Sequence, residues 1–207
     1  MSNARHPLTL ADWRRQVAEM YAAVRHHDHP SEAWYDFRAR RDTLFKIHPQ
    51  SPLNDRQRAS FVSLPYFAYD PAWRLAGSID GNIERETFTT HLEADGELRY
   101  TRVAKIDFVV QERHRSLSLF WIEGYGGGLF LPFKDASNGR ATYGGGRYLY
   151  DTIKGADLNT GWNDFILDFN YAYNPSCAYN DQWFCPLAPP ENRLSFAVAA
   201  GERASPV

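Results

Sequence analysis

Apolar side chains recur every three or four residues near the beginning of the chain. They are Trp13, Val17, Met20, Tyr21 and Val24. This spacing places them on one face of a helix, and that face must pack against something. The hydroxyl of Thr9, followed by the carboxylate of Asp12, can satisfy amides of a first helical turn, so we expect the helix to begin at Thr9. Pro30 disfavours helix in the residue before it, so we expect the helix to end near His26.

Two further helices are predicted before residue 58. Ser31 can cap a helix that closes before Pro49. Ser51 followed by Pro52 is typical of an N-cap with a first-turn proline, which predicts a short third helix to about residue 58.

From about residue 61 the pattern changes to short β-rich runs separated by Gly, Asn, Asp and Pro. Eight strand candidates cover residues 73–79, 85–92, 98–110, 116–123, 129–133, 147–150, 165–171 and 194–199. Short turn sequences between neighbouring candidates predict hairpins. The predicted fold class is mainly β: an antiparallel barrel, or a strongly curved sheet or sandwich, with two or three N-terminal helices packed against it. We expect one domain over residues 1–207, with a helical segment at 1–58 and a β body at 59–207.

Composition and charge narrow the possible partners. The chain has 207 residues, of which 43% are hydrophobic and 15% aromatic, so it can form a core and is not disordered as a whole. A net charge of -2 excludes the broad basic field expected for nucleic-acid or anionic-lipid binding. No apolar run reaches the roughly 18 residues of a membrane span, and the first thirty residues lack a secretory signal. We therefore expect a cytoplasmic protein that binds neither nucleic acid nor membrane.

The sequence Tyr-Gly-Gly-Gly occurs twice, at residues 125–128 and 143–146, and each copy precedes a strand candidate. The amides of Gly145 and Gly146, followed by Arg147, could bind an anion. Alternatively, both copies are sharp bends in which each Tyr packs over a bare glycine. Arg147 could also form an internal ion pair with Asp151, Asp168 or Glu191, which would leave no room for a ligand.

The run 167–174 alternates between polar and aromatic residues. As a strand it would place Asp168 and Asn170 on one face. If that face points inward, the two side chains could orient a ligand in a barrel mouth; if it points outward, they are solvated.

The only two cysteines, Cys177 and Cys185, lie in a proline-rich loop at 174–193. Their spacing matches neither a zinc site nor a known redox motif. They could be small buried thiols that fill space, or Cys177 could be a nucleophile, which would need a base and a lowered pKa. A long ordered loop of this kind often covers a functional site.

We expect one pocket to collect these candidates. The candidate ligand-binding residues are Tyr143, Gly145, Gly146, Arg147, Asn170, Asn174, Tyr179 and Arg193. The candidate catalytic residues are Asp168, Cys177 and Glu191. No metal site and no cofactor are predicted, and the tract at 26–29 is interpreted as a solvated helix end despite its three histidines.

Several long motifs carry a resemblance to a known family. They are the runs at 123–133, 143–149, 167–170, 173–179 and 185–194, together with Lys-Ile-His-Pro-Gln-Ser-Pro-Leu at 46–53. In these runs the chain, from about residue 34 to 202, resembles the domain-of-unknown-function family numbered 1684. The resemblance implies a mainly bacterial and archaeal family with no established activity, and it supports one domain and a cytoplasmic location.

Three functions stay open at this point. The chain could bind a small polar or anionic molecule at one end of a barrel-like sheet. It could be an enzyme, hydrolase-like, that uses a carboxylate acid or base or Cys177. It could also be a homo-oligomeric interaction protein without a small-molecule ligand.

Overall fold

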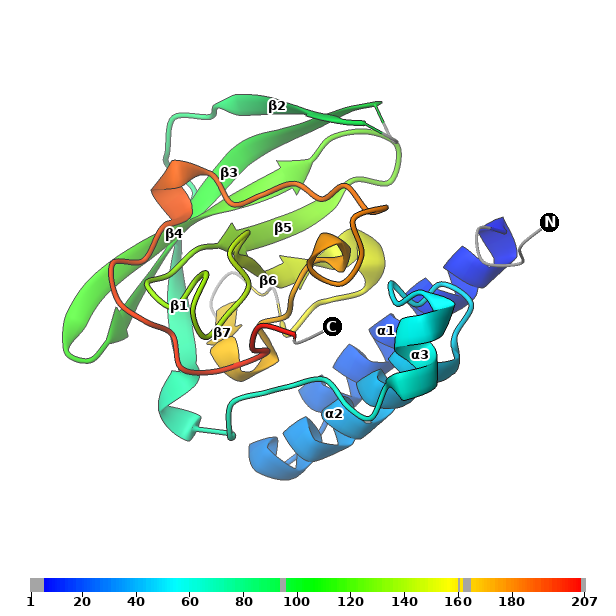
Figure 1. Ribbon diagram of the computed structural model, residues 1–207. Helices are drawn as coiled ribbons and strands as arrows, with labels where there is room; N and C mark the ends of the chain where they lie inside the picture. Colours follow the sequence, from blue (N-terminus) through cyan, green and yellow to red (C-terminus); the bar gives the residue numbers. More distant parts are fainter. Residues whose placement is uncertain (1–5, 94–95, 160, 162–164, 206–207) are drawn as a thin grey trace.

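Two long helices lie side by side along one side of a curled sheet (Figure 1). The structure is a computed structural model that describes residues 6–93, 96–159, 161 and 165–205. The helices are α1 (Pro7–Arg25), α2 (Pro30–Ile47) and the short α3 (Asp55–Ser60). The three predicted helices are thus confirmed.

The helix starts differ from the predicted ones: other residues cap α1 and α3, and α2 begins at a proline without a side-chain cap. In α1 the His6 side chain accepts from the amide of Leu8, so the helix begins before Thr9. Pro30 itself is the first residue of α2, ahead of Ser31. In α3 the Asn54 side chain accepts from the Gln57 amide, and Gln57 reciprocates, so the helix begins after Ser51 and Pro52.

The sheet contains seven antiparallel strands within the described residues. They are β1 (Arg74–Asp80), β2 (Thr87–Leu92), β3 (Gly96–Val110), β4 (Arg113–Ile122), β5 (Gly128–Phe133), β6 (Arg147–Asp151) and β7 (Phe165–Asp168). Their order is β6-β5-β4-β3-β1-β7, with β2 beside the first half of β3. The sheet curls into an open half-barrel, which confirms the predicted mainly β fold with N-terminal helices (Figure 1).

Two strand predictions were wrong. The strand predicted at 165–171 ends at Asp168, and a 3-10 turn, η4 (Phe169–Tyr171), follows it. The alternation at 167–174 therefore does not describe one continuous strand. Residues 194–199 form no strand, and the neighbouring Arg193 makes only an isolated bridge to Lys134.

The η4 turn connects the sheet to the helices. The indole Nε1 of Trp34 on α2 donates to the Asn170 carbonyl oxygen at 3.0 Å. The ring of Phe37 meets that of Tyr171 edge-on, with centroids 4.9 Å apart. Pairs of this geometry contribute about 0.5–1.5 kcal/mol beyond the area they bury. Aromatic packing at η4 therefore fixes the helices over the open side of the half-barrel.

The proline-rich loop is held at both ends. Near its end, η6 (Pro190–Asn192) presents Asn192, whose Nδ2 donates to the Ser118 and Pro132 carbonyls at 2.8 Å each. Near its beginning, η5 (Ser176–Ala178) precedes Tyr179, whose carbonyl accepts from Gln57 of α3 at 2.7 Å. The loop thus runs from the helices to β4 and β5.

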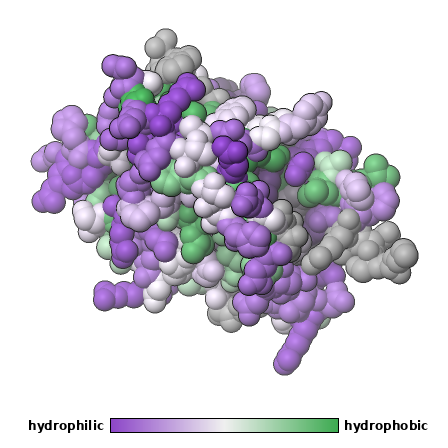
Figure 2. Space-filling view, turned by 90° about the horizontal axis from the view of Figure 1, so that it is seen from above, coloured by the Kyte–Doolittle hydropathy of each residue, from purple (hydrophilic) through white to green (hydrophobic). Residues whose placement is uncertain are grey.

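The surface seen from above is largely hydrophilic, with apolar residues in small scattered groups (Figure 2). Among the described residues, no helix has the length and apolar character needed to cross a membrane.

Candidate functional site

A hollow of about 470 Å³ opens between the first turns of α1 and the proline-rich loop. It is lined by Leu10, Trp13, Arg14, Gln50, Lys154, Ser176, Gln182, Trp183, Phe184 and Cys185. Its volume lies in the range of small-molecule sites, roughly 300–1,000 Å³. We call this space the loop hollow.

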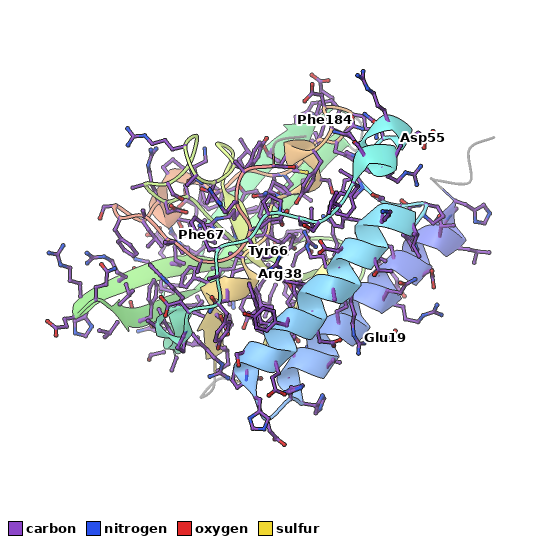
Figure 3. The ribbon with its side chains drawn as sticks, turned by 60° about the horizontal axis from the view of Figure 1, so that its bottom comes forward. Glu19, Arg38, Asp55, Tyr66, Phe67 and Phe184 are labelled. Atoms are coloured by element: carbon purple, nitrogen blue, oxygen red, sulfur yellow. The ribbon has the colours of Figure 1, made fainter. Side chains whose placement is uncertain are left out.

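Other hollows of the surface differ from this one in size or in lining. One that brings together Arg25, Arg74 and Asp168 has a volume of only about 140 Å³, below the usual range of small-molecule sites. One of about 510 Å³ lies between α1 and α2 and is lined by helix-surface residues such as Glu19 and Thr43. Figure 3 shows Glu19 on α1, away from Phe184 of the proline-rich loop. The loop hollow is distinguished by two cations, three aromatic rings and a thiol. Small-molecule sites typically combine aromatic side chains with a few converging polar or charged groups.

Two cations of the loop hollow lie near enough to interact. Lys154 ends the 3-10 turn η3 (Thr152–Lys154), and its ammonium lies 3.1 Å from Oδ2 of the buried Asp151. Asp151 raises the pKa of Lys154, whereas the charge of Arg14 acts in the opposite direction. Within the described part of the chain, Arg14 takes part in no ion pair. Two positive charges therefore line this space, and the buried carboxylate of Asp151 pairs with one of them.

The aromatic wall of the loop hollow is anchored to the helical segment. The indole Nε1 of Trp183 donates to the Pro52 carbonyl at 3.3 Å. Trp13 packs edge-on against His48, with ring centroids 5.2 Å apart. Phe184 is 37% exposed and lines the same hollow. Flat side chains held in this way present apolar surface next to the two cations.

The thiol pair lies in the same wall. The backbone amide of Cys177 donates to Sγ of Cys185 at 3.4 Å, and the thiol of Cys177 is hydrogen-bonded to Cys185. The hydroxyl of Tyr143 donates to Sγ of Cys177 at 3.6 Å. Both cysteines are free and partly buried. The loop hollow therefore has Cys185 on its surface and Cys177 directly behind it.

Donors around Cys185 favour its thiolate. Its pKa falls to about 6, first because the Cys177 thiol donates to it, and further because of the Cys177 amide and the charge of Lys154. The same hydrogen bond, together with burial, raises the pKa of Cys177. Of the two sulfurs, Cys185 has the properties of a nucleophile, whereas the sequence suggested Cys177.

Arg147 lies in the interior, where its side chain has no exposed surface. Nη2 of Arg147 donates to Oδ2 of Asp135 at 2.9 Å and to the Val198 carbonyl at 3.0 Å, and Nη1 donates to the Ala200 and Glu202 carbonyls. The alternative of an internal ion pair therefore describes this residue, with Asp135 as the partner in place of the three carboxylates considered from the sequence.

Asn174 and Tyr179 belong to a network around the buried carboxylate of Glu202. Oε2 of Glu202 accepts from Arg41 and from the Asn174 amide, at 3.1 Å each, and Oε1 accepts from the Tyr179 hydroxyl. Burial raises the pKa of Glu202, and the charge of Arg41 opposes the shift. These side chains join the proline-rich loop and α2 to the C-terminal segment.

Asp168 and Asn170 form a separate pair. Oδ1 of Asp168 accepts from the amide and from Nδ2 of Asn170, at 3.0 and 2.8 Å. The side chain of Asn170 also bonds the backbone of Asp70: Oδ1 accepts from the Asp70 amide, and Nδ2 donates to the Asp70 carbonyl. Burial raises the pKa of Asp168 to about 6, against the effect of these bonds and of Arg74, whose Nε lies 3.7 Å away.

The remaining candidates lie elsewhere. Glu191 accepts from Nη1 of Arg102 at 3.0 Å, and Arg193 is exposed. Gly145 lies beneath the Tyr143 ring. Within the described residues, no hydrogen bond or ion pair joins Arg147 to Asp168 or to Glu191. The structure thus places the predicted residues in separate groups, and none of them lines the loop hollow. Cys177 contacts Cys185 of its wall, and Tyr143 contacts Cys177.

The residues that sequence reasoning missed are Trp13, Arg14, Lys154, Trp183 and Cys185. The sequence placed Trp13 on the apolar face of the first helix, which predicted core packing and not a binding site. Arg14, the next residue, lies on the solvent-exposed face of the helix, where a charged residue is expected. Only tertiary packing brings it near Lys154.

The fold and the site define a curled antiparallel half-barrel covered by helices, with a thiol-bearing hollow at their junction. Residues 59–203 match the family described as "Protein of unknown function (DUF1684)", and the chain belongs to that family. The family resemblance seen in the sequence is confirmed.

A solved structure of similar fold comes from Haloarcula marismortui. It is the solution NMR structure of the uncharacterized protein from gene locus rrnAC0354, which is 33% identical over 86% of this chain and 97% of the other, with a TM-score of 0.61. No curated protein matches the chain.

Proposed function

We propose that the protein binds a small anionic molecule with a flat apolar body in the loop hollow. The observation that carries this proposal is the proximity of Arg14 and Lys154 beside three aromatic rings in one space of about 470 Å³. An anionic group would relieve the repulsion between the two cations, and a flat body would stack on the rings.

This proposal keeps the ligand class expected from the sequence and moves its site. Arg147 uses both terminal nitrogens for internal acceptors, so the cations of the loop hollow take its place. The side chain of Lys154 is half exposed, Arg14 is exposed, and both line the hollow, so a ligand there can reach both residues. The affinity of an anion for such solvent-exposed charges should fall as the salt concentration rises, because salt ions screen the charges.

The test compares four probes: phenyl phosphate, inorganic phosphate, benzoate and benzyl alcohol. A ligand that binds only the folded state raises the melting temperature. We expect phenyl phosphate and benzoate to raise it more than inorganic phosphate or benzyl alcohol do. Titration calorimetry then gives the affinity of the best probe.

Variants assign the binding to the loop hollow. Arg14→Gln and Lys154→Gln are each expected to weaken binding about fivefold, the loss of about 1 kcal/mol for one partly exposed charged contact. Arg15→Gln is the matched control, since Arg15 follows directly on α1, lies outside the hollow and pairs with Asp12. Equal affinity in Arg14→Gln and wild type, or no binding of any probe, would contradict the proposal.

A further inference from the structure

The two sulfurs of the chain are positioned as a pair. Cys177 and Cys185 are eight positions apart, yet the amide of one donates to the sulfur of the other at 3.4 Å. The chain has no other cysteine, so any intramolecular disulfide must join these two. The space-filling role considered from the sequence does not require the two thiols to be hydrogen-bonded to each other, as they are here.

The surroundings of the two sulfurs are unequal. Cys185 lines the loop hollow, near the ammonium of Lys154, and receives hydrogen bonds from Cys177. Cys177 lies behind it and accepts from the hydroxyl of Tyr143. Both cysteines are partly exposed, but only Cys185 lines the hollow, and its surroundings favour the thiolate, whereas those of Cys177 favour the neutral thiol.

We propose that Cys185 and Cys177 form an oxidisable dithiol site in which Cys185 reacts with a small hydroperoxide and Cys177 then completes a disulfide. This activity does not depend on the anion proposed above. It requires only that the oxidant reach the loop hollow, whose volume admits a small molecule.

The chemistry proceeds in two balanced steps. The Cys185 thiolate attacks the terminal oxygen of the hydroperoxide: an S–O bond forms, the O–O bond breaks, and the leaving alkoxide takes a proton to become an alcohol. Cys185 is now a sulfenic acid, oxidised by two electrons, and the peroxide is reduced by two. Cys177 loses its proton and attacks the Cys185 sulfur: an S–S bond forms, the S–O bond breaks, and hydroxide leaves with that proton as water. Two external thiols can restore the dithiol.

The position of Cys177 also explains its second role. While Cys185 is a thiolate, Cys177 donates a hydrogen bond to it, and this bond disfavours loss of the Cys177 proton. Once Cys185 has become a sulfenic acid, that acceptor is lost and Cys177 is free to attack. The order of the two steps thus follows from the hydrogen bond between Cys177 and Cys185.

The test treats the reduced wild type with hydrogen peroxide. We expect both thiols to disappear together, the intact mass to fall by two hydrogens, the protein to show no intermolecular disulfide, and dithiothreitol to reverse the change. In Cys177→Ser we expect a sulfenic acid at Cys185 that dimedone traps. In Cys185→Ser we expect Cys177 to react at least tenfold more slowly than Cys185 does in wild type.

A second measurement uses the wild type alone, so it does not depend on variants folding. Peptide mapping after brief alkylation at a series of pH values gives a midpoint for each sulfur. We expect Cys185 to be modified first, with a midpoint well below the free-cysteine value of roughly 8.5. Lys154→Gln should raise that midpoint, while Arg15→Gln should leave it unchanged. Equal alkylation of both cysteines, a midpoint near the free value, or oxidation only to intermolecular dimers would overturn the proposal.

Discussion

Asp168 is a buried carboxylate whose charge is expected to reduce stability at neutral pH. Its side chain is 3% exposed, and burial raises its pKa from 3.8 to about 6. The folded state therefore holds a proton more tightly than the unfolded state does. Stability falls as pH rises between these two values, and the loss is complete above the folded pKa. A shift of this size corresponds to about 3 kcal/mol.

The substitution Asp168→Asn removes this cost and keeps the shape of the side chain. The amide oxygen can still accept from the amide and Nδ2 of Asn170, as Oδ1 of Asp168 does. The shift to a pKa of about 6 already includes the opposing attraction of Arg74, so the loss of this pairing is not subtracted again. We expect a net gain of about 3 kcal/mol at neutral pH and little change in acid, where wild-type Asp168 is already protonated.

Urea unfolding of both proteins between about pH 4 and about pH 7 measures the difference. The variant should gain about 3 kcal/mol relative to wild type across this interval. Asp107→Asn is the control, because Asp107 is an exposed carboxylate on β3. Parallel stability curves for wild type and Asp168→Asn would refute the assignment of a buried, proton-binding carboxylate.

Two further substitutions test the interior contacts, each by urea unfolding. Arg147→Met leaves Asp135 as a buried carboxylate without its cation, so we expect the free energy of unfolding to fall by about 3–5 kcal/mol. A fall of less than about 1 kcal/mol would contradict the buried ion pair of Arg147 and Asp135. Asn192→Ala removes three hydrogen bonds to the backbone of Ser118 and Pro132, at about 1 kcal/mol each, so we expect a loss of about 3 kcal/mol; an unchanged midpoint would contradict the anchoring of η6.

Local patterns predicted the helices and most strands because those elements depend on spacing that the sequence carries directly. The helix starts were less accurate, since several polar residues near a start can serve as caps, and α2 begins at Pro30 without a side-chain cap. The strand at 165–171 was overextended because η4 continues an aromatic pattern in another conformation. The cytoplasmic location and the single domain stay predictions. Whether the protein forms a homo-oligomer also stays open to measurement.

The site was harder to predict because its residues come together only through tertiary packing. Arg14 lies on α1, Lys154 follows β6, and Cys185 lies in the loop between η5 and η6. No spacing rule joins three such positions. The sequence predicts that the proline-rich loop covers a functional site, which stays a prediction; this loop contributes Cys185 and two of the aromatic rings to the loop hollow.

The repeated Tyr-Gly-Gly-Gly shows why a plausible anion motif can have a structural use. In the second copy, Gly146 has φ +97°, and a Cβ there would lie 2.6 Å from the Phe133 carbonyl oxygen. Its amide donates to the Tyr143 carbonyl at 3.1 Å, so it already has an acceptor. The ring of Tyr143 covers Gly145, as the alternative of a sharp bend requires, whereas Tyr125 of the first copy is exposed. The turn therefore leads directly into β6, whose first residue pairs with Phe133 of β5. Arg147 is that residue, and its side chain enters the core directly.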